Sequence, residues 1–181
     1  AEKRGLPNLK TTPVALDAMV TEKAKKVFLD NGIYTHAELE ARHEIELEKY
    51  IKKVQIEARL MGDLATNHII PAAIKYQNVL LQNVSLLREA ALPEKLYKGQ
   101  LTLLKEVCTH IQEVYDNVHE MVEARKVANN IEDTRAKAIT YEAKVKAQYF
   151  DKIRYHVDKL EELVDDELWT LPKYRELLFL R

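Results

Sequence analysis

Residues that break helices and form turns are scarce in this chain, and their scarcity limits what it can fold into. The 181 residues include four glycines, five prolines and a single serine, Ser85. A β-sandwich or an alternating β–α array needs a turn after every short element and therefore many more residues of this kind. The sequence predicts few and long elements, and it contains no internal repeat beyond a heptad spacing.

Apolar residues recur at near-heptad steps in three long stretches. The first set is Leu47, Ile51, Val54, Ala58, Met61, Ala65 and Ile69. The second is Leu103, Val107, Ile111, Val114, Val118 and Met121. The third is Ile139, Ala143, Phe150, Ile153, Val157, Leu160 and Val164, with Lys146 filling one step. Such faces pack antiparallel at about 20°. We therefore expect an all-α fold, an elongated antiparallel bundle of three to four long helices with short helices at each end.

Local signals divide the chain into a short lead-in and a helical remainder. Residues 1–11 contain several breakers and predict an extended lead-in, and residues 12–181 predict a single helical bundle domain. Thr12 is expected to cap a first helix, with Pro13 in its first turn, and this helix should end at Asn31-Gly32.

Two further helix starts have a specific capping signal. Thr35 and Glu38 have the spacing of a capping box, which predicts the start of the next helix. Asp133 is a plausible N-cap for the last long helix, after a turn at Asn129-Asn130. Lys173 to Leu180 predicts a short final helix that docks apolar side chains onto the bundle. These side chains are Tyr174, Leu177, Leu178 and Phe179.

Pro71 lies inside a helical pattern that continues to about Ala91. Proline removes one helical N–H and clashes with the carbonyl of Asn67, at a cost of about 3 kcal/mol in an ordinary helix. Either the helix kinks there or it breaks and restarts, and the apolar residues that follow favour a kinked continuation. Gly62, nine residues before Pro71, is expected to let another backbone approach closely.

Candidate metal ligands do not form a convincing set. Di-iron bundles need a Glu-x-x-His on each of two helices and a Glu from each of two others. Glu40 and His43 match that spacing once, whereas Asp116 and His119 have the wrong carboxylate. We therefore predict no metal ligand, no cofactor-binding residue and no catalytic residue in this chain.

Other reactive groups also lack the partners that chemistry needs. Ser85 has no nucleophile elbow around it, and four scattered glycines form no phosphate-binding loop. Asn67 and His68 either contact a ligand or partner at the bend, or satisfy backbone groups that Pro71 frees, a role that Thr66 could share. Cys108 is expected to act as a small buried hydrophobe, with a reactive thiol as the alternative.

Charge patterns give little support for nucleic-acid or membrane binding. The net charge is −1, and no run of 18 apolar residues exists. Basic and aromatic residues alternate from Tyr141 to Tyr155, but flanking acids favour a solvated helix face over a base-stacking surface. The acidic stretch from Leu160 to Trp169 is expected to be offset by Lys173 or Arg175.

Three strings of the sequence resemble the C-terminal region of type III glutamine synthetase, the long-chain bacterial form. The first is Arg4-Gly-Leu-Pro-Asn-Leu, followed by Thr12-Pro13. The second runs from Glu44 to Asn78 and includes Asn67-His-Ile-Ile-Pro-Ala-Ala-Ile-Lys-Tyr-Gln-Asn78. The third comprises Tyr155-His-Val-Asp-Lys-Leu, Asp165-Asp-Glu-Leu-Trp169 and Leu171-Pro-Lys-Tyr-Arg-Glu-Leu-Leu-Phe179.

The resemblance implies a parent enzyme that joins ammonia to glutamate through γ-glutamyl phosphate, using ATP and magnesium or manganese. It implies that residues 1–11 lead in from an upstream catalytic domain, and that active sites form between identical subunits of a homo-oligomeric ring. The missing initiator Met and the absence of catalytic motifs favour a fragment that is silent alone and acts in subunit packing or assembly. The single cysteine and the resemblance favour a cytoplasmic location. An independent helical scaffold or regulatory module without an enzymatic parent is the alternative.

Overall fold

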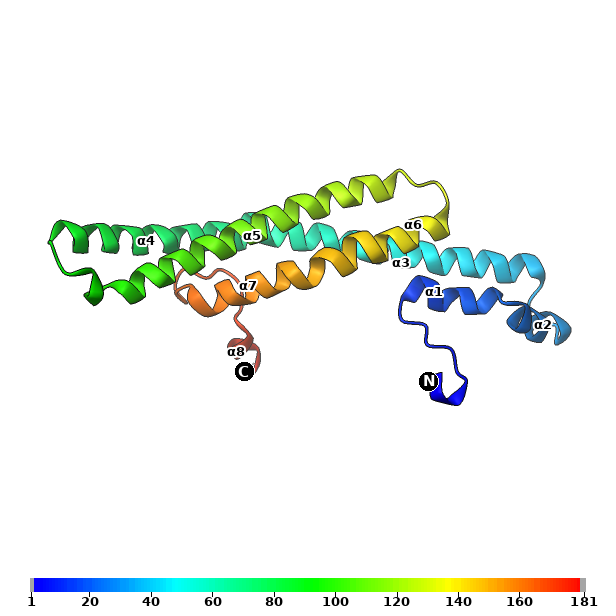
Figure 1. The fold of residues 1–181 in the computed structure, drawn as a ribbon. Helices are drawn as coiled ribbons and strands as arrows, with labels where there is room; N and C mark the ends of the chain where they lie inside the picture. Colours follow the sequence, from blue (N-terminus) through cyan, green and yellow to red (C-terminus); the bar gives the residue numbers. More distant parts are fainter. Residues whose placement is uncertain (1, 180–181) are drawn as a thin grey trace. The chain divides into compact units, whose positions relative to one another are not determined.

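The computed structural model describes residues 2–179, and 81% of these residues are helical (Figure 1). The α-helices are α1 (Thr12–Leu16), α2 (Glu22–Asp30), α3 (His36–Leu64), α4 (Ile70–Glu89), α5 (Lys98–Asn129), α6 (Thr134–Thr140), α7 (Asp151–Leu163) and α8 (Tyr174–Leu177). Two π-helices are η3 (Ala65–Ile69) and η5 (Tyr141–Phe150), and three 3-10 turns are η1 (Glu2–Arg4), η2 (Asp17–Val20) and η4 (Glu94–Leu96). The described residues contain no strand, so the all-α prediction is confirmed.

The described chain divides into two compact units. The first unit contains the residues up to Ala58 together with Glu123–Gln148, and the second contains Arg59–Val122 together with the residues from Tyr149 on. This division is geometric and does not test the single domain predicted for residues 12–181, which stays a prediction.

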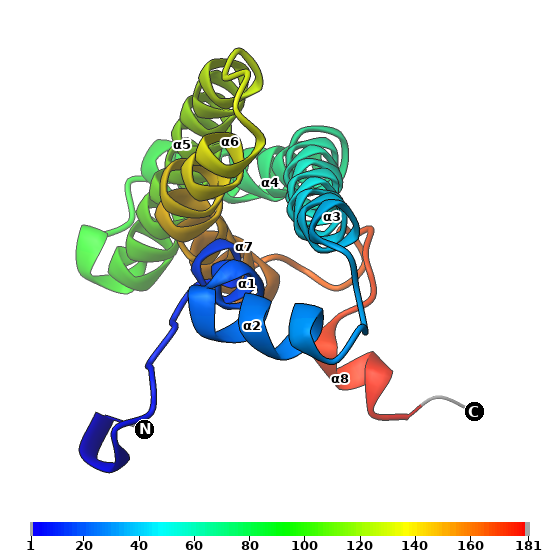
Figure 2. The same cartoon turned by 90° about the vertical axis from the view of Figure 1, so that its right-hand side faces the viewer.

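In the first unit, α3 runs parallel to α6 and the start of η5. Contacts pair Glu44 with Thr134 and Tyr50 with Glu142, so residue numbers rise together on the two helices. The side chains of Leu39, Leu47, Val54, Ala138 and Tyr141 are almost completely buried between these elements. Helix α1 packs against α6, and Figure 2 shows the two close together.

In the second unit, α5 runs antiparallel to α4 on one side and to α7 on the other. Gln77 contacts Cys108 and Asn83 contacts Gln100, so numbers fall along α5 as they rise along α4. The core of this unit includes Val84, Val107, Val114, Met121, Ile153 and Leu160. The antiparallel packing predicted for long helices is found for these pairs.

The helix ends are formed by the local chemistry that the sequence predicts. Thr35 and Glu38 form the capping box: the Thr35 N–H donates to Glu38 Oε2 at 2.8 Å, and the Glu38 N–H donates to Thr35 Oγ1 at 3.3 Å. Asp133 caps α6 by accepting from the Ala136 N–H at 2.6 Å. Gly32 ends α2 at φ +60, where its N–H donates to the carbonyl of Leu29.

The first predicted helix is interrupted. A 3-10 turn, η2, separates α1 from α2, and Thr21 then starts α2 by accepting from the Ala24 N–H at 3.3 Å. The N-cap of α1 is Thr11 and not Thr12, so the helix begins one residue earlier than predicted. The lead-in also contains the η1 turn, so it is not extended throughout.

The helix continues through Pro71 and does not break. The proline is accommodated by η3, in which the Ile70 N–H donates to the carbonyl of Ala65, five residues earlier. A π-helical turn contains an extra residue and shifts the side chains that follow. Ala72 and Ala73 are therefore buried, whereas Ile74 and Leu81, two of the apolar residues that follow Pro71, are 41% and 54% exposed.

The second π-helix, η5, also changes which residues face the core. Buried side chains recur at steps of four: Tyr141, Val145, Tyr149 and Ile153. The predicted seam residues Ala143 and Phe150 are exposed and half-buried, respectively. Tyr141 and Tyr149 are therefore core residues and do not belong to the solvated face predicted for this segment, whereas Tyr155 is 56% exposed.

The end of the chain differs from the prediction. The final helix α8 is a single turn that ends at Leu177. The apolar residues predicted to dock do not: Leu178 and Phe179, which follow α8, are each 78% exposed. Trp169 and Lys173 are the buried side chains of this region instead. Within residues 2–179, no helix is long and apolar enough to cross a membrane.

Candidate functional site

The residues that matched metal-binding spacing are engaged locally. His36 Nδ1 lies 3.3 Å from Glu40 Oε2, and His43 Nε2 lies 3.2 Å from Asp17 Oδ1. Asp116 accepts a hydrogen bond from Gln112 Nε2 at 2.9 Å. Within the described residues, no group of three or more His, Cys, Asp or Glu side chains is arranged to hold a metal ion.

Asp17 forms the most extensive ion-pair cluster of the first unit. Arg135 Nε and Nη2 donate to its two carboxylate oxygens at 2.9 and 2.7 Å, and His43 contacts it from α3. The Arg135 hydrogen bonds hold the pKa of the Asp17 carboxyl below its usual value, against the opposing effect of burial. The cluster connects the segment between α1 and α2 to both α3 and α6.

A second polar network crosses the core of the first unit. The Tyr50 hydroxyl donates to Glu142, whose Oε2 also lies 3.5 Å from Lys146 Nζ. Nearby, the Tyr141 hydroxyl donates to Asn129 Oδ1 at 2.6 Å, and Gln55 Nε2 donates to that hydroxyl at 3.0 Å. Each buried hydroxyl therefore has a partner, as buried polar groups require.

Two histidines face each other in the second unit. His110 Nδ1 on α5 lies 2.9 Å from His156 Nδ1 on α7, so one ring donates a hydrogen bond to the other. Burial lowers the pKa of His110, and a charge on His156 lowers it further. Lys159 acts in the same direction, whereas Glu106 and Glu113 oppose it. The arrangement favours the neutral form of His110.

The remaining candidates have structural partners. Ser85 Oγ donates weakly to Glu89 at 3.4 Å on an exposed face. Cys108 is half-buried, and its sulfur accepts from Gln77 Nε2 at 3.2 Å, so it is only partly the small buried hydrophobe that was predicted.

The polar side chains before Pro71 do not bond to the backbone groups that Pro71 was predicted to free. Thr66 Oγ1 donates to the carbonyl of Gly62 at 2.7 Å, and Asn67 Nδ2 donates to Asp63 Oδ1 at 2.5 Å. His68 lies on an exposed surface of η3. The carbonyl that Thr66 serves precedes η3, so this bond does not compensate for the missing N–H of Pro71.

The acidic end of α7 is neutralised as expected. Lys173 Nζ lies 2.6 Å from Asp166 Oδ1 and donates to the carbonyl of Val164 at 2.9 Å. Arg175 also pairs with Asp166. The prediction that Lys173 or Arg175 offsets this acidic stretch is therefore confirmed, with both residues contributing.

Sequence reasoning missed the clusters that join distant segments. Asp17 and Arg135 are 118 residues apart, and His110 and His156 are 46 apart, so no local spacing connects either pair. The four-residue spacing of Tyr141, Val145 and Tyr149 is the sequence signal that could have found the buried tyrosines.

These contacts define a helical structural domain in which polar clusters fix the helices to one another. Residues 1–88 match the family model described as glutamine synthetase C-terminal domain. Over 182 residues the chain is 44% identical to a glutamine synthetase of Bacteroides fragilis, covering 99% of this chain and 25% of the relative. It is 32% identical over 187 residues to the type-3 glutamine synthetase of Dictyostelium discoideum, covering 100% of this chain and 25% of the relative.

A glutamine synthetase of Butyrivibrio fibrisolvens is 28% identical over 179 residues, covering 99% of this chain and again 25% of the relative. The chain spans about a quarter of the length of these curated relatives. Its first 88 residues match the glutamine synthetase C-terminal domain family, and nearly its whole length is similar to proteins named glutamine synthetase.

Proposed function

We propose that this chain is the C-terminal helical part of a type-3 glutamine synthetase and that it packs and positions the subunits of the parent enzyme. The observation that carries the proposal is the match over 99% of the chain to a relative four times as long. The parent would join ammonia to glutamate with ATP through γ-glutamyl phosphate, in the cytoplasm.

The chain would contribute structure and not catalysis to that reaction. Its polar clusters are ion pairs and hydrogen bonds between helices, and Ser85 makes only a weak 3.4 Å hydrogen bond to Glu89 on an exposed face. ATP and magnesium or manganese would be bound by the catalytic part of the parent, and no residue of this chain is assigned to them. The partners would be the parent's own catalytic domain and neighbouring identical subunits of a ring.

Exposed apolar side chains supply surfaces for such packing. In the second unit, Val79, Leu81 and Leu86 on α4 are each more than half exposed, as are Leu178 and Phe179 near the end of the chain. Single exposed apolar residues are common, whereas a patch of them marks an interaction surface. Leu178 and Phe179 are adjacent in the chain, and Val79 and Leu86 lie seven residues apart on one face of α4. Contact with the rest of a large enzyme would cover them.

A chimera tests the proposal. The corresponding quarter of the Bacteroides fragilis glutamine synthetase is replaced by this chain, and glutamine formation and oligomer mass are measured together. We expect an active oligomer of the parent's size, and no glutamine from the 181-residue chain alone. A folded chimera that neither assembles nor makes glutamine would contradict the assignment, and would favour an independent helical module.

A paired variant of the chimera tests the packing surface. Replacing Leu178 and Phe179 with serine should shift the oligomer toward smaller species, because each change removes exposed apolar area that a partner would bury. Replacing the exposed polar residues Lys144 and Gln148 with serine is the matched control. Equal assembly of both variants would exclude the chain end as a packing surface.

A further inference from the structure

A cleft of about 370 Å³ opens in the first unit between α1, α3 and η5. Its volume lies in the range of small-molecule sites. Tyr50 and Val54 form an apolar floor and are almost completely buried, and half-buried Leu16 forms one wall. The cleft can therefore take a small ligand with a partly apolar body.

Most of the charges around this cleft neutralise one another. Lys49 Nζ lies 2.6 Å from Glu46 Oε1, and Lys146 Nζ lies 3.5 Å from Glu142 Oε2. These four groups contribute little net charge to the cleft.

Two opposite charges in the lining differ from the rest. Lys53 and Glu57 both line the cleft, and neither forms an ion pair or side-chain hydrogen bond with any residue that the structure describes. They lie four residues apart on α3, on the same helical face, which brings one ammonium and one carboxylate to a single opening. The cleft therefore presents one available charge of each sign above an apolar floor.

We propose that this cleft binds a small zwitterion, a free α-amino acid. Its α-carboxylate would accept hydrogen bonds from Lys53 Nζ, and its α-ammonium would donate to the carboxylate of Glu57. Charge-assisted hydrogen bonds are stronger than neutral ones and require both signs on the ligand. Glu57 disfavours simple anions, so phosphate is a poor match. The amino acid side chain would lie on Tyr50 and Val54.

L-glutamine is the probe, a choice that rests on the proposed function, whereas the recognition of a zwitterion does not. The complete 181-residue chain is labelled with ¹⁵N and titrated with L-glutamine, and amide shifts are followed by NMR. We expect saturable shifts confined to the residues around the cleft, with Kd on the order of 1 mM. N-acetyl-L-glutamine lacks the ammonium and L-glutaminamide lacks the carboxylate, so both should bind at least about tenfold more weakly.

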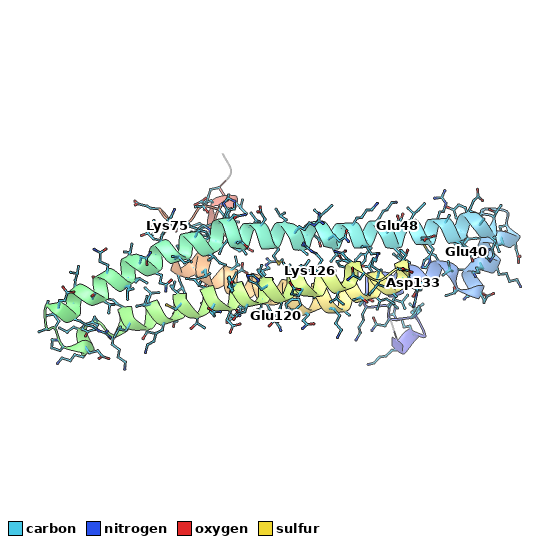
Figure 3. All side chains as sticks on the ribbon, turned by 90° about the horizontal axis from the view of Figure 1, so that it is seen from above. Glu40, Glu48, Lys75, Glu120, Lys126 and Asp133 are labelled. Carbon is cyan, nitrogen blue, oxygen red and sulfur yellow. The ribbon has the colours of Figure 1, made fainter. Side chains whose placement is uncertain are left out.

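Matched variants separate the cleft from the general surface of α3. Lys53→Met and Glu57→Gln should each weaken L-glutamine binding at least about tenfold. The controls are Lys52→Met and Glu48→Gln, which change exposed residues of α3 outside the cleft; Glu48 projects from α3 in Figure 3. Far-UV circular dichroism of each variant verifies that the helices are retained.

Three results would overturn the proposal: no saturable shift, equal binding of N-acetyl-L-glutamine, or equal weakening by the control variants. Shifts produced by inorganic phosphate with the same affinity would indicate a simple anion site and would also overturn it. The chimera experiment reads assembly and activity, not binding to this chain. A failed titration beside a successful chimera therefore rejects the amino acid site alone.

Discussion

Replacing Gly62 with alanine should stabilise the protein. Gly62 lies inside α3 with an ordinary helical backbone, and a Cβ built there meets only Val118 Cγ1, at 3.8 Å. That is normal van der Waals contact, so the expected close approach of another backbone is not what the structure has. Glycine inside a helix is about 1 kcal/mol less favourable than alanine. Partial burial of the new methyl against Val118 adds a few tenths more, for a total of about 1–1.5 kcal/mol.

Urea unfolding followed by far-UV circular dichroism measures this change. The midpoint should rise while the slope of the transition stays constant, because the unfolded chain is almost unaltered. For a protein of this size, the melting temperature should rise by about 3–5 °C. Gly32→Ala is the control: it forces a Cβ into φ +60 and should destabilise by about 1 kcal/mol.

A lower midpoint for Gly62→Ala would refute the reasoning. It would mean that the helix or its neighbour must shift to admit the methyl, and hence that α3 and α5 pack more closely there than the 3.8 Å contact implies. Equal and opposite changes at Gly62 and Gly32 would show that backbone conformation, and not the residue type, decides the effect.

Three further predictions concern a helix end, an ion pair and a pH response. Ala91 has φ 53 at the end of α4, so Ala91→Gly should raise the free energy of unfolding by about 0.5–1 kcal/mol in the same urea assay. Asp17→Asn and Arg135→Gln should show a coupling of about 1 kcal/mol in a double-mutant cycle, because the pair is bidentate but partly exposed. Burial lowers the pKa of His110 beside His156, so the unfolded state binds the extra proton first. The stability that neutral His110 contributes is fully present above the unfolded-state pKa of about 6.5 and is lost as the pH falls below it. His110→Gln should therefore flatten this part of the curve of unfolding free energy against pH.

Each of these has a contrary result. A lower stability for Ala91→Gly would show that a contact of the Ala91 methyl outweighs the strain of its backbone. Additive effects of the Asp17 and Arg135 changes would mean that solvent already screens the pair. An unchanged pH profile in His110→Gln would show that another group titrates in that range.

The sequence predicted the helix ends best, because their chemistry is local. The capping box at Thr35 and Glu38 and the cap at Asp133 each depend on residues three apart, and all of them form. The seam from Leu47 to Ile69 was also largely right, with Met61 half-buried as its exception. Here an ordinary α-helical period holds up to Leu64, and η3 begins only at Ala65.

The errors arose where the helical period changes or where contacts are distant. Inside η5 the buried residues follow Tyr141, Val145 and Tyr149, so extrapolating a seven-residue period selected Ala143 and Phe150 instead. A local pattern carries no information on a π-helical turn, which tertiary packing stabilises. The partners of Asp17 could not be predicted from local sequence either, because the ion pair with Arg135 depends on how α6 packs.

The π-helical turn η3 also restricts how this segment can change length. Ala65 and Ile69 are buried before Pro71, and Ala72, Ala73 and Val84 are buried after it. Deleting one residue from η3 would restore an ordinary helix and rotate every later side chain by about 100° around its axis. Insertions and deletions should therefore be absent between these buried positions in relatives, even where the exposed residues differ freely. Variation in chain length should instead concentrate in the connections at residues 90–97 and 130–133.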